Sequence, residues 1–436
     1  MSETLSNPLQ LPCGATIPNR FCKAAMTECI ADVRNYATEG HARLYEVWGA
    51  GGAGLLLTGN VQIARSHLEH PGNVVIDGRP SDEAMAALSA FAAAGKSGGS
   101  KIYMQISHAG RQTPASVNAS PLAPSAIPLT LPGSAFGEPV AMTGEQVKDV
   151  IARFANTSKI AQETGFDGVQ LHAAHGYLIS QFLSPKSNRR EDEWGGSLEN
   201  RARLLVESVR AIRAVTGPSF PISVKLNSAD FQSGGFTHED CLGVVDMLNA
   251  EGVDLLEITG GNYEQPKMAN VEGLEPVFEE EVRESTRARE AYFIGYAKSA
   301  RERANMPIMA TGGFRTLGAM EAAIQDGEAD MIGMARPLCV EPDLPNRLLS
   351  GDVSIAPDWE NRLSLGPTKW LGKNSPINLI KTLNGWGVQG WFNLQLIRMS
   401  EGQAPDTGIG VFKAFTTYQK LTTEAAKAYK ADLETA

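Results

Sequence analysis

The sequence has few cysteines, no surplus of positive charge and no long hydrophobic run. Its five cysteines are scattered without a Cys-x-x-Cys pair, so neither a disulfide framework nor a structural zinc site is expected. The 39 Lys and Arg residues against 49 Asp and Glu give a net charge of −10. This charge disfavours nucleic-acid and anionic-membrane binders, because both need a basic face. No stretch approaches the roughly 18–20 apolar residues that span a membrane. We therefore expect no nucleic-acid partner and no membrane partner.

Two local signals are also missing. The first residues, MSETLSNPLQLP, have neither the basic nor the apolar region of a secretory signal, so we expect a cytoplasmic protein. The first apolar run, FCKAAM from Phe21, is not followed by a Gly-x-Gly-x-x-Gly turn. A doubly wound dinucleotide-binding sheet would need that turn, so it is the less favoured architecture.

The sequence contains short apolar runs, each followed by a longer stretch with helical periodicity. This alternation is typical of βα units around a parallel sheet, and eight units indicate a closed α/β fold, the (β/α)8 TIM barrel. The eight runs are FCKAAM from Phe21, GLLLTG from Gly54, KIYMQI from Lys101, DGVQLH from Asp167, ISVKLN from Ile222, VDLLEIT from Val253, PIMATG from Pro307 and DMIGMA from Asp330.

The helical periodicity is clearest in four of the intervening segments, and three connections are unusually long. The long connections follow strands, so they lie on the face of a barrel that carries the chemistry, and we expect them to wall the pocket. The predicted helices are Thr143–Glu163, Leu198–Val215, His238–Ala250 and Leu317–Gln325; the long connections are Ser107–Thr143, Ala173–Ser197 and Gly260–Arg287.

This alternation of apolar runs and helical stretches stops near Leu349. This point divides the chain into a barrel over 1–350 and a C-terminal extension over 351–436. The extension holds four of the six tryptophans, and aromatic residues at that density need burial. We therefore expect most of it to pack on the barrel or at a subunit interface. Its last part, Phe412–Ala436, reads as a surface helix with a frayed end.

The densest polar stretch, LHAAHGYLISQFLSPKSNRREDEWGGSLENR, begins at Leu171. His172 closes a strand and is followed by His175 and Tyr177, so three groups that exchange or share protons emerge at the functional rim. Two histidines that merely hold a turn would explain the pair equally well. Two histidines three apart can also chelate a metal, which keeps a metal-dependent hydrolase open, but no third ligand lies at a helpful spacing and we predict no metal site.

A second set of residues falls at the ends of other predicted strands. Glycines in PIMATGGFRT and the turn of DMIGMARP, which ends in Arg336, follow the seventh and eighth strands, where such barrels bind phosphate with backbone N–H groups. Gln105 and Lys225 lie near strand ends, where side chains point into the barrel mouth. Either could instead be a buried hydrogen-bonding or salt-bridging residue.

Taken together, HAAHGYLISQFLSPKSNRREDEWGGSLENR, QISHAGRQ, ATGGFRT and MIGMARP resemble the motifs of the Old Yellow Enzyme family of FMN-dependent ene-reductases, in order from about Leu9 to Leu349. The resemblance implies a (β/α)8 barrel that binds FMN, takes hydride from NADPH or NADH and reduces activated C=C bonds of enones. The partner would then be a small electrophilic alkene, bound by a monomer or a homodimer.

The resemblance also implies roles for individual residues. His172 and His175 would hydrogen-bond the substrate carbonyl oxygen, and Tyr177 would donate the proton. Thr27 would bond the flavin O4 edge, and Lys225 would stabilise the anionic reduced flavin. The full cofactor-binding set comprises Ala25, Met26, Thr27 and Asn60 beside the ring, Gln105 and Lys225 at the pyrimidine edge, and Gly312, Gly313, Ala335 and Arg336 at the phosphate.

Two departures from the family pattern matter. Lys225 replaces the usual Arg, so a two-pronged grip becomes a point charge. Ala335 replaces the usual Gly, which requires a negative φ there. Within the family, a dienoyl-CoA reductase-like enzyme and an NADH oxidase-type flavoenzyme remain alternatives, although the former would need a cysteine cluster after Cys339 and a further domain.

Overall fold

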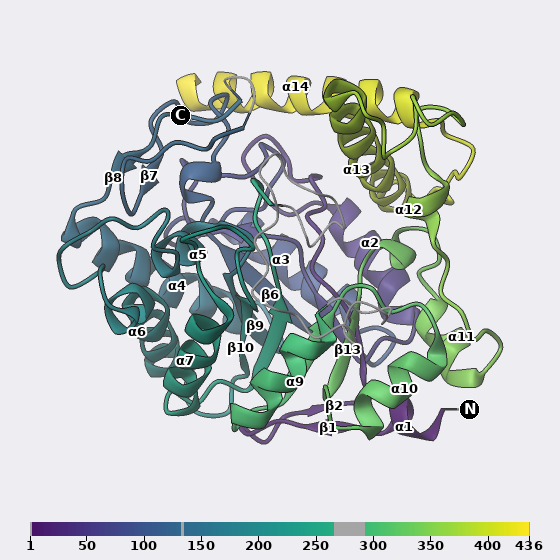
Figure 1. The fold of residues 1–436 in the computed structure, drawn as a ribbon, viewed down its shortest axis with the longest axis horizontal. Coiled ribbons are helices and arrows are strands. Elements are labelled where there is room, and N and C mark those ends of the chain that lie inside the picture. The colour runs from purple at the N-terminus through teal and green to yellow at the C-terminus, as the bar shows by residue number, and fades with distance from the viewer. Residues whose placement is uncertain (1, 132–134, 266–292, 436) are drawn as a thin grey trace.

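The computed structural model describes residues 2–131, 135–265 and 293–435. Within these residues eight parallel strands pair side by side, and the last pairs with the first, so the sheet closes into a barrel (Figure 1). Each strand lies at one of the eight predicted runs, which confirms the (β/α)8 fold. The strands are β3 (Phe21–Lys23), β4 (Leu55–Leu57), β6 (Lys101–Ser107), β9 (Gly168–Ala173), β10 (Ile222–Asn227), β11 (Leu255–Thr259), β12 (Ile308–Thr311) and β13 (Met331–Met334).

Helices follow each strand and form the outer layer. The four helices predicted from periodicity are confirmed, and Thr143 and Thr237 begin two of them with reciprocal capping boxes that satisfy exposed backbone N–H groups. The outer helices are α2 (Glu39–Ala50), α3 (Asp82–Gly95), α4 (Gly144–Glu163), α6 (Leu198–Thr216), α7 (His238–Asn249), α9 (Ile294–Arg303), α10 (Leu317–Gln325) and α11 (Leu344–Ser350).

Successive side chains on each strand point alternately towards the outer helices and into the barrel interior. On β10, Val224 and Leu226 pack against the outer helices, so Lys225 between them faces the barrel interior. Near the amino-terminal ends of the strands the interior is apolar, with residues such as Leu255 and Met309. Towards the carboxyl ends the interior positions become polar.

A two-stranded hairpin closes the amino-terminal end of the barrel. Its strands are β1 (Leu9–Gln10) and β2 (Thr16–Ile17), which pair antiparallel. Leu9 and Ile17 pack with the apolar interior residues of the barrel strands. This end is therefore sealed by hydrophobic burial.

The loops at the opposite end hold short elements. Part of the predicted loop Gly260–Arg287 lies outside the described residues, which resume at 293. The short elements of these loops are β5 (Val61–Gln62), the 3-10 helix η1 (Gly110–Gln112), β7 (Leu122–Ala123), β8 (Val140–Ala141), α5 (Leu178–Leu183) and the 3-10 helix η3 (Arg336–Cys339). The short helix α1 (Glu3–Ser6) precedes the hairpin at the other end.

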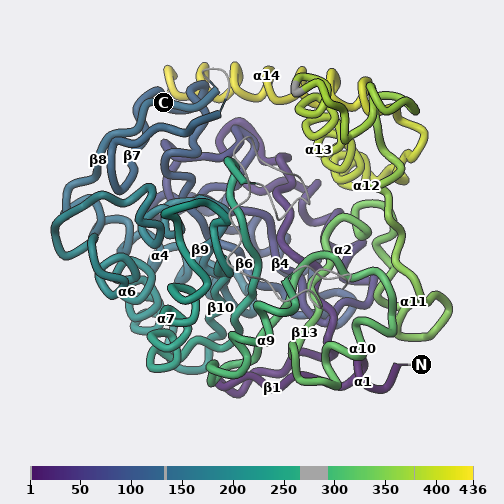
Figure 2. The backbone as a smooth tube through the Cα atoms, viewed as in Figure 1, coloured from purple at the N-terminus to yellow at the C-terminus, as the bar shows by residue number. Residues whose placement is uncertain are grey.

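The C-terminal extension contains α12 (Trp359–Arg362), α13 (Asn378–Ser400) and α14 (Val411–Thr435). Helix α13 packs against α2, and α14 runs back across the upper edge of the molecule in Figures 1 and 2. Trp391 is fully buried in this chain, whereas Trp370 and Trp386 are 62% and 52% exposed.

Helix α14 lies mostly on the surface, with only Val411, Ala414 and Tyr429 buried, and two contacts tie its last turns to the barrel. The Tyr429 hydroxyl donates to the backbone oxygen of Arg65 at 2.8 Å, and the Arg65 guanidinium pairs with Asp432 at 2.6 Å. The helix reaches Thr435, so the fraying predicted for its last turns is not seen as far as that residue. Its end is held by these two contacts.

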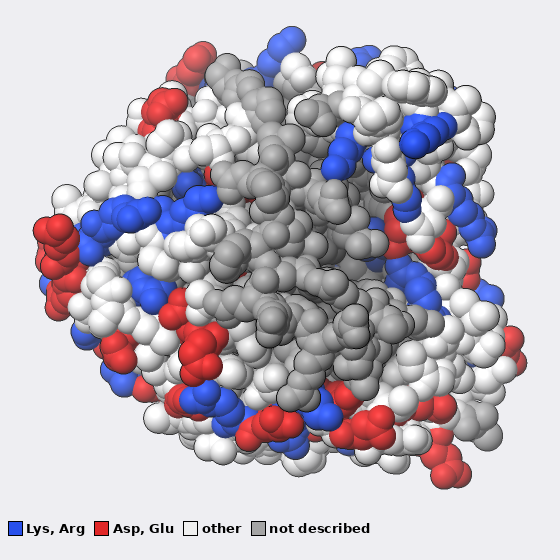
Figure 3. Space-filling model, viewed as in Figure 1, with Lys and Arg blue, Asp and Glu red and all other residues white. Residues whose placement is uncertain are grey.

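Within the described ranges, every helix is too short or too polar to cross a bilayer. Figure 3 shows acidic and basic side chains interspersed along the lower edge of the face in view. The net charge of −10 is therefore not gathered as one acidic patch along that edge.

Candidate functional site

Three ring side chains meet where β9 ends. The centroid of the His172 ring lies 5.1 Å from that of His175 and 4.6 Å from that of Tyr177. His175 has a φ of 59°, a left-handed conformation that is uncommon outside glycine, and its N–H donates to Asn227 Oδ1 at 3.1 Å. The turn thus brings together the three residues predicted to be catalytic.

The protonation states of these groups suit hydrogen-bond donation. Burial, and then the nearby Lys225 charge, hold the pKa of His172 and of His175 well below the ordinary histidine value, so both rings are neutral. Ala174 N–H donates to His172 Nδ1 at 3.3 Å, which leaves the Nε2–H as the donor of that ring. Burial, and then Glu69 and Tyr263, raise the pKa of Tyr177 well above 10, so its phenol keeps its proton at neutral pH.

A chain of polar side chains crosses the barrel interior beneath these rings. Gln105 donates to Gln170 at 2.6 Å, and Gln170 donates to Glu257 at 3.0 Å. Glu257 pairs with Lys225 at 2.9 Å, and both side chains are almost fully buried. The strand register explains the grouping, because Gln105 is opposite Gln170 and Lys225 is opposite Glu257.

The predicted phosphate residues also come together. Gly312 and Gly313 have φ of 101° and 87°, a conformation that glycine adopts without steric cost. Ala335 has a φ of −121°, so the alanine is accommodated there. Arg336 lies 3.5 Å from Glu360 of α12, and Arg315 pairs with the same carboxylate.

Thr27 and Asn60 meet at a carboxylate that the sequence did not reveal. Glu69 follows β5, and its Oε1 accepts from Thr27 Oγ1 and, at 2.8 Å, from Asn60 Nδ2. Its Oε2 accepts from the hydroxyl of Tyr177, which also lies 2.8 Å from that of Tyr263. The remaining predicted residues, Ala25 and Met26, are partly exposed on the loop after β3.

Sequence reasoning missed six polar residues of the site: Gln170, Glu257, Glu69, Tyr263, Arg315 and Glu360. A signal existed for Glu257, because a charged residue inside the apolar run VDLLEIT needs a partner when that run is buried. Glu69 lies in an irregular segment and Glu360 in the four-residue helix α12, and neither is long enough in regular structure for periodicity to indicate which way the side chain points. Only the tertiary structure reveals their contacts.

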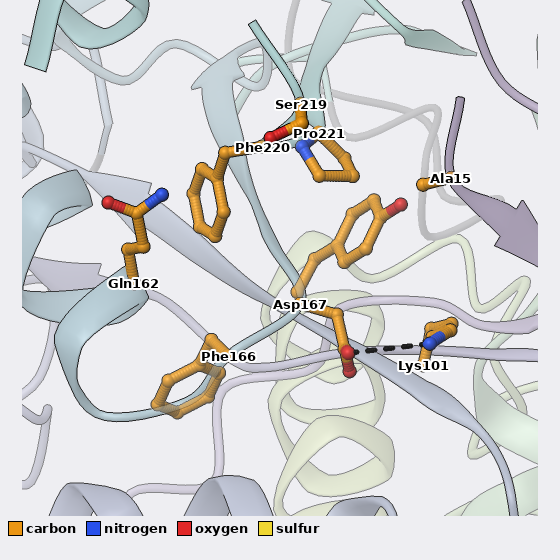
Figure 4. Close-up of a pocket in the computed structure, with 9 residues that line it drawn as sticks. Ala15, Lys101, Gln162, Phe166, Asp167, Ser219, Phe220 and Pro221 are labelled. Atoms are coloured by element: carbon orange, nitrogen blue, oxygen red, sulfur yellow. Dashed lines mark ion pairs between the residues drawn. The ribbon is translucent and has the colours of Figure 1, made fainter. Parts of the chain in front are cut away.

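Among the described residues, neither a metal site nor the surface pocket adds chemistry to this end of the barrel. In the part of the chain that the structure describes, no three His, Cys, Asp or Glu side chains are grouped to hold a metal ion. A surface pocket of about 210 Å³ lies among Ala15, Lys101, Asp167 and Pro221, where Lys101 pairs with Asp167 at 3.6 Å (Figure 4). These residues lie at the amino-terminal ends of the strands, the end of such barrels associated with stability.

The residues at the carboxyl end suit FMN by their chemistry. Asn60 Oδ1 is a buried acceptor to which no described residue donates, which fits the N–H edge of a planar ring. Two left-handed glycines with two guanidiniums form an anion-binding set, and the carboxylate of Glu360 is already held by those guanidiniums. Buried Lys225 supplies a cation inside the barrel.

Comparisons with known proteins identify the family of the chain. The model of the NADH:flavin oxidoreductase / NADH oxidase family matches residues 4–353. The NADH-dependent flavin oxidoreductase iliE of Neonectria sp. (strain DH2) is 38% identical over 355 residues, which cover 78% of this chain and 46% of that protein. The NADH-dependent flavin oxidoreductase iccE of Talaromyces variabilis is 34% identical over 405 residues, which cover 88% of this chain and 96% of that one.

Solved structures give the same result. An Old Yellow Enzyme homologue from Zymomonas mobilis matches with a TM-score of 0.66 at 26% identity, covering 80% of this chain and 93% of the other. The chain spans less than half of the Neonectria relative and almost all of the Talaromyces one. The chain belongs to the NADH:flavin oxidoreductase / NADH oxidase family of FMN- and NAD(P)H-dependent oxidoreductases, which confirms the resemblance to the Old Yellow Enzymes.

Proposed function

We propose that this protein reduces the activated C=C bond of small electrophilic alkenes, enones foremost, with NADPH or NADH as the reductant. The observation that carries the proposal is the cluster of two neutral histidines and one protonated tyrosine at the end of β9. Polarisation of a carbonyl and delivery of one proton are the two tasks that such a reduction leaves to the protein.

FMN, when bound, would supply the hydride. Thr27 and Asn60 would border its ring, together with Ala25 and Met26. Gln105 and Lys225 would hold the pyrimidine edge, where the lysine places a positive charge. The phosphate would lie among Gly312, Gly313, Ala335 and Arg336.

His172 and His175 would bind the substrate carbonyl oxygen. Negative charge builds on that oxygen as the β-carbon gains hydride, and two N–H donors aimed at it stabilise the charge. Neutral rings serve this role, because each has one N–H that donates without surrendering its proton. The low pKa of both rings keeps them in that state at neutral pH.

Tyr177 would donate the proton to the α-carbon. Its phenol stays protonated until the substrate arrives, since burial and neighbouring oxygens raise its pKa. The site is also largely shielded, because His172 and Tyr177 are 3% and 5% exposed. This shielding strengthens the electrostatic contacts and limits competing reactions with water.

The test is anaerobic consumption of NADPH and NADH by purified holoenzyme with a panel of enones. We expect the flavin released on denaturation to be FMN, and the saturated ketone to form in step with reductant loss. Consumption only when oxygen is admitted would favour the NADH oxidase-type alternative. A protein that binds no added FMN would contradict the proposal altogether.

A further inference from the structure

The Glu69 carboxylate accepts hydrogen bonds from three site residues on different loops. These are Thr27 after β3, Asn60 after β4 and Tyr177 after β9. The hydroxyl of Tyr263, on the loop after β11, lies 2.8 Å from the hydroxyl of Tyr177. An ionised carboxylate only accepts hydrogen bonds, so Glu69 matches this ring of donors.

The position of Glu69 is fixed by its own backbone. The N–H groups of Glu69 and His70 both donate to Asn73 Oδ1, at 3.1 and 2.9 Å. Asn73 Nδ2 in turn donates to Asn60 O at 3.3 Å. Outside this turn, His70 lies 3.1 Å from Thr422 Oγ1 of α14. This hydrogen-bonded turn therefore holds the Glu69 carboxylate towards Tyr177.

This contact constrains the proton of Tyr177. While Glu69 is ionised, the phenol O–H points at Oε2 and is not free for a substrate. If Tyr177 then lost its proton, a phenolate would face a carboxylate, and two adjacent anions repel. A protonated Glu69 removes both obstacles, because its O–H donates to the phenol oxygen.

We propose that Glu69 is a positioning residue that controls and refills the proton of Tyr177, which rests on the proposed alkene reduction. The O–H bond of Tyr177 breaks as the C–H bond forms at the α-carbon. When Glu69 is protonated, its carboxyl O–H bond breaks in the same step and a new phenol O–H bond forms. The Glu69 carboxylate then takes a proton from water, and no electrons move beyond the hydride.

Other titratable groups face this pair from every side. His172 lies beside Tyr177, and Tyr263 faces it from the loop after β11. Cys29 after β3 and Tyr418 of α14 lie near the carboxylate and interact with its charge, and both have pKa values raised mainly by burial. The histidine is neutral and the phenols and thiol keep their protons, so Glu69 is the carboxyl group of this set that lies in hydrogen-bond contact with the Tyr177 hydroxyl.

The experiment measures the two half-reactions of the holoenzyme separately by anaerobic stopped-flow, from about pH 5 to about pH 9. Wild type, Glu69→Gln, Glu69→Asp and Tyr263→Phe are compared with NADPH and then with 2-cyclohexenone. We expect wild-type reoxidation by the enone to slow as the pH rises, by up to about tenfold per unit. Glu69→Gln should be about 10–100-fold slower and independent of pH.

The other variants separate a proton role from a structural one. Glu69→Asp should restore the pH dependence, and Tyr263→Phe, which removes only the second hydroxyl at Tyr177, should keep it. Reduction by NADPH should change far less than reoxidation does in the Glu69 variants, because hydride transfer to the flavin does not use the Tyr177 proton. A wild-type pH profile in Glu69→Gln, or an equal loss in both half-reactions, would overturn the proposal.

Failure of the proposed function has a different signature. Wild type that NADPH reduces but the enone does not reoxidise would overturn the alkene reduction itself. If Glu69→Gln does not retain FMN, a proton inventory on wild-type reoxidation decides instead. A curved inventory supports two protons moving in one step, and a linear inventory overturns the relay.

Discussion

The two ends of the barrel differ in what fills them and in what covers them. The amino-terminal half of the interior is apolar and sealed by the β1–β2 hairpin, with residues such as Leu9, Ile17 and Leu255 in one cluster. The carboxyl half holds the buried chain from Gln105 to Lys225, and polar contacts of α14 brace its rim. The first end stabilises the fold, whereas the second concentrates charge where a ligand can use it.

The largest expected effect is that of a substitution at Tyr177, in the carboxyl half of the barrel. Tyr177→Phe should slow reoxidation by an enone about 10²–10⁴-fold, since the general acid is lost, and leave reduction by NADPH nearly intact. Tyr103→Phe is the matched control, because Tyr103 is a buried phenol in the apolar half. Anaerobic stopped-flow measures both steps. Equal slowing by the two substitutions would contradict the contrast between the ends.

A second prediction compares stability with cofactor binding. Lys225→Met leaves Glu257 buried without its cation, so the free energy of unfolding should fall by about 3–5 kcal/mol. Leu255→Ala, in the apolar half, should cost about 2–5 kcal/mol through the cavity it leaves. FMN affinity, measured by fluorescence quenching, should fall only for Lys225→Met. Loss of FMN affinity in both variants would mean that the apolar half of the barrel also determines cofactor binding.

A third prediction compares α14, which contacts the rim at the carboxyl end, with the hairpin that closes the amino-terminal end. Burial lowers the pKa of His70, which stacks on Tyr418 of α14, from 6.5 to about 4. The unfolded chain takes up this proton first, so the free energy of unfolding should fall as the pH drops from 6.5 to about 4, by at most about 3 kcal/mol. Above pH 6.5 the effect is absent.

Urea unfolding at pH 7 and pH 4 checks this acid sensitivity. His70→Asn can still accept the Gly72 N–H bond but does not titrate, so it should lose less stability between these pH values than wild type. A variant with an unchanged pH dependence would show that His70 does not couple α14 to the rim. The hairpin at the other end relies on apolar packing and should contribute nothing to this loss.

The smallest predicted effect lies at the phosphate residues. Glu360 pairs with Arg315 and Arg336, so it competes with a phosphate for the same guanidiniums. Glu360→Gln should tighten FMN binding to the apoenzyme a few-fold, about 1 kcal/mol for such a partly exposed pair. Riboflavin, which lacks the phosphate, is the control and should bind equally well to both proteins. Weaker FMN binding would show that Glu360 instead holds the arginines in place.

The sequence predicted the strands well because each is a short buried run bounded by turn residues. It also located His172, His175 and Tyr177, which are neighbours along the chain. It could not find Glu69, which is 108 residues from Tyr177 and lies in an irregular loop. The contact between His70 and Thr422 joins residues 352 apart, so the role of α14 in bracing the rim was equally invisible.

The buried polar side chains inside the barrel were predicted only in part. Lys225 and Gln105 were recognised by their places at strand ends, but their partners Glu257 and Gln170 were not. Their pairing depends on strand register, and register appears only once the barrel has closed. Residue types at strand ends are thus readable from a sequence, whereas the partners across neighbouring strands are not.

The most direct test of the central claim is a single turnover of the wild-type holoenzyme without oxygen. NADPH or NADH is mixed with the enzyme until the flavin absorbance bleaches, and 2-cyclohexenone is then added in one equivalent. The account predicts that the absorbance returns as one equivalent of cyclohexanone forms. Bleached enzyme that stays bleached with the enone and recovers only with oxygen would contradict it.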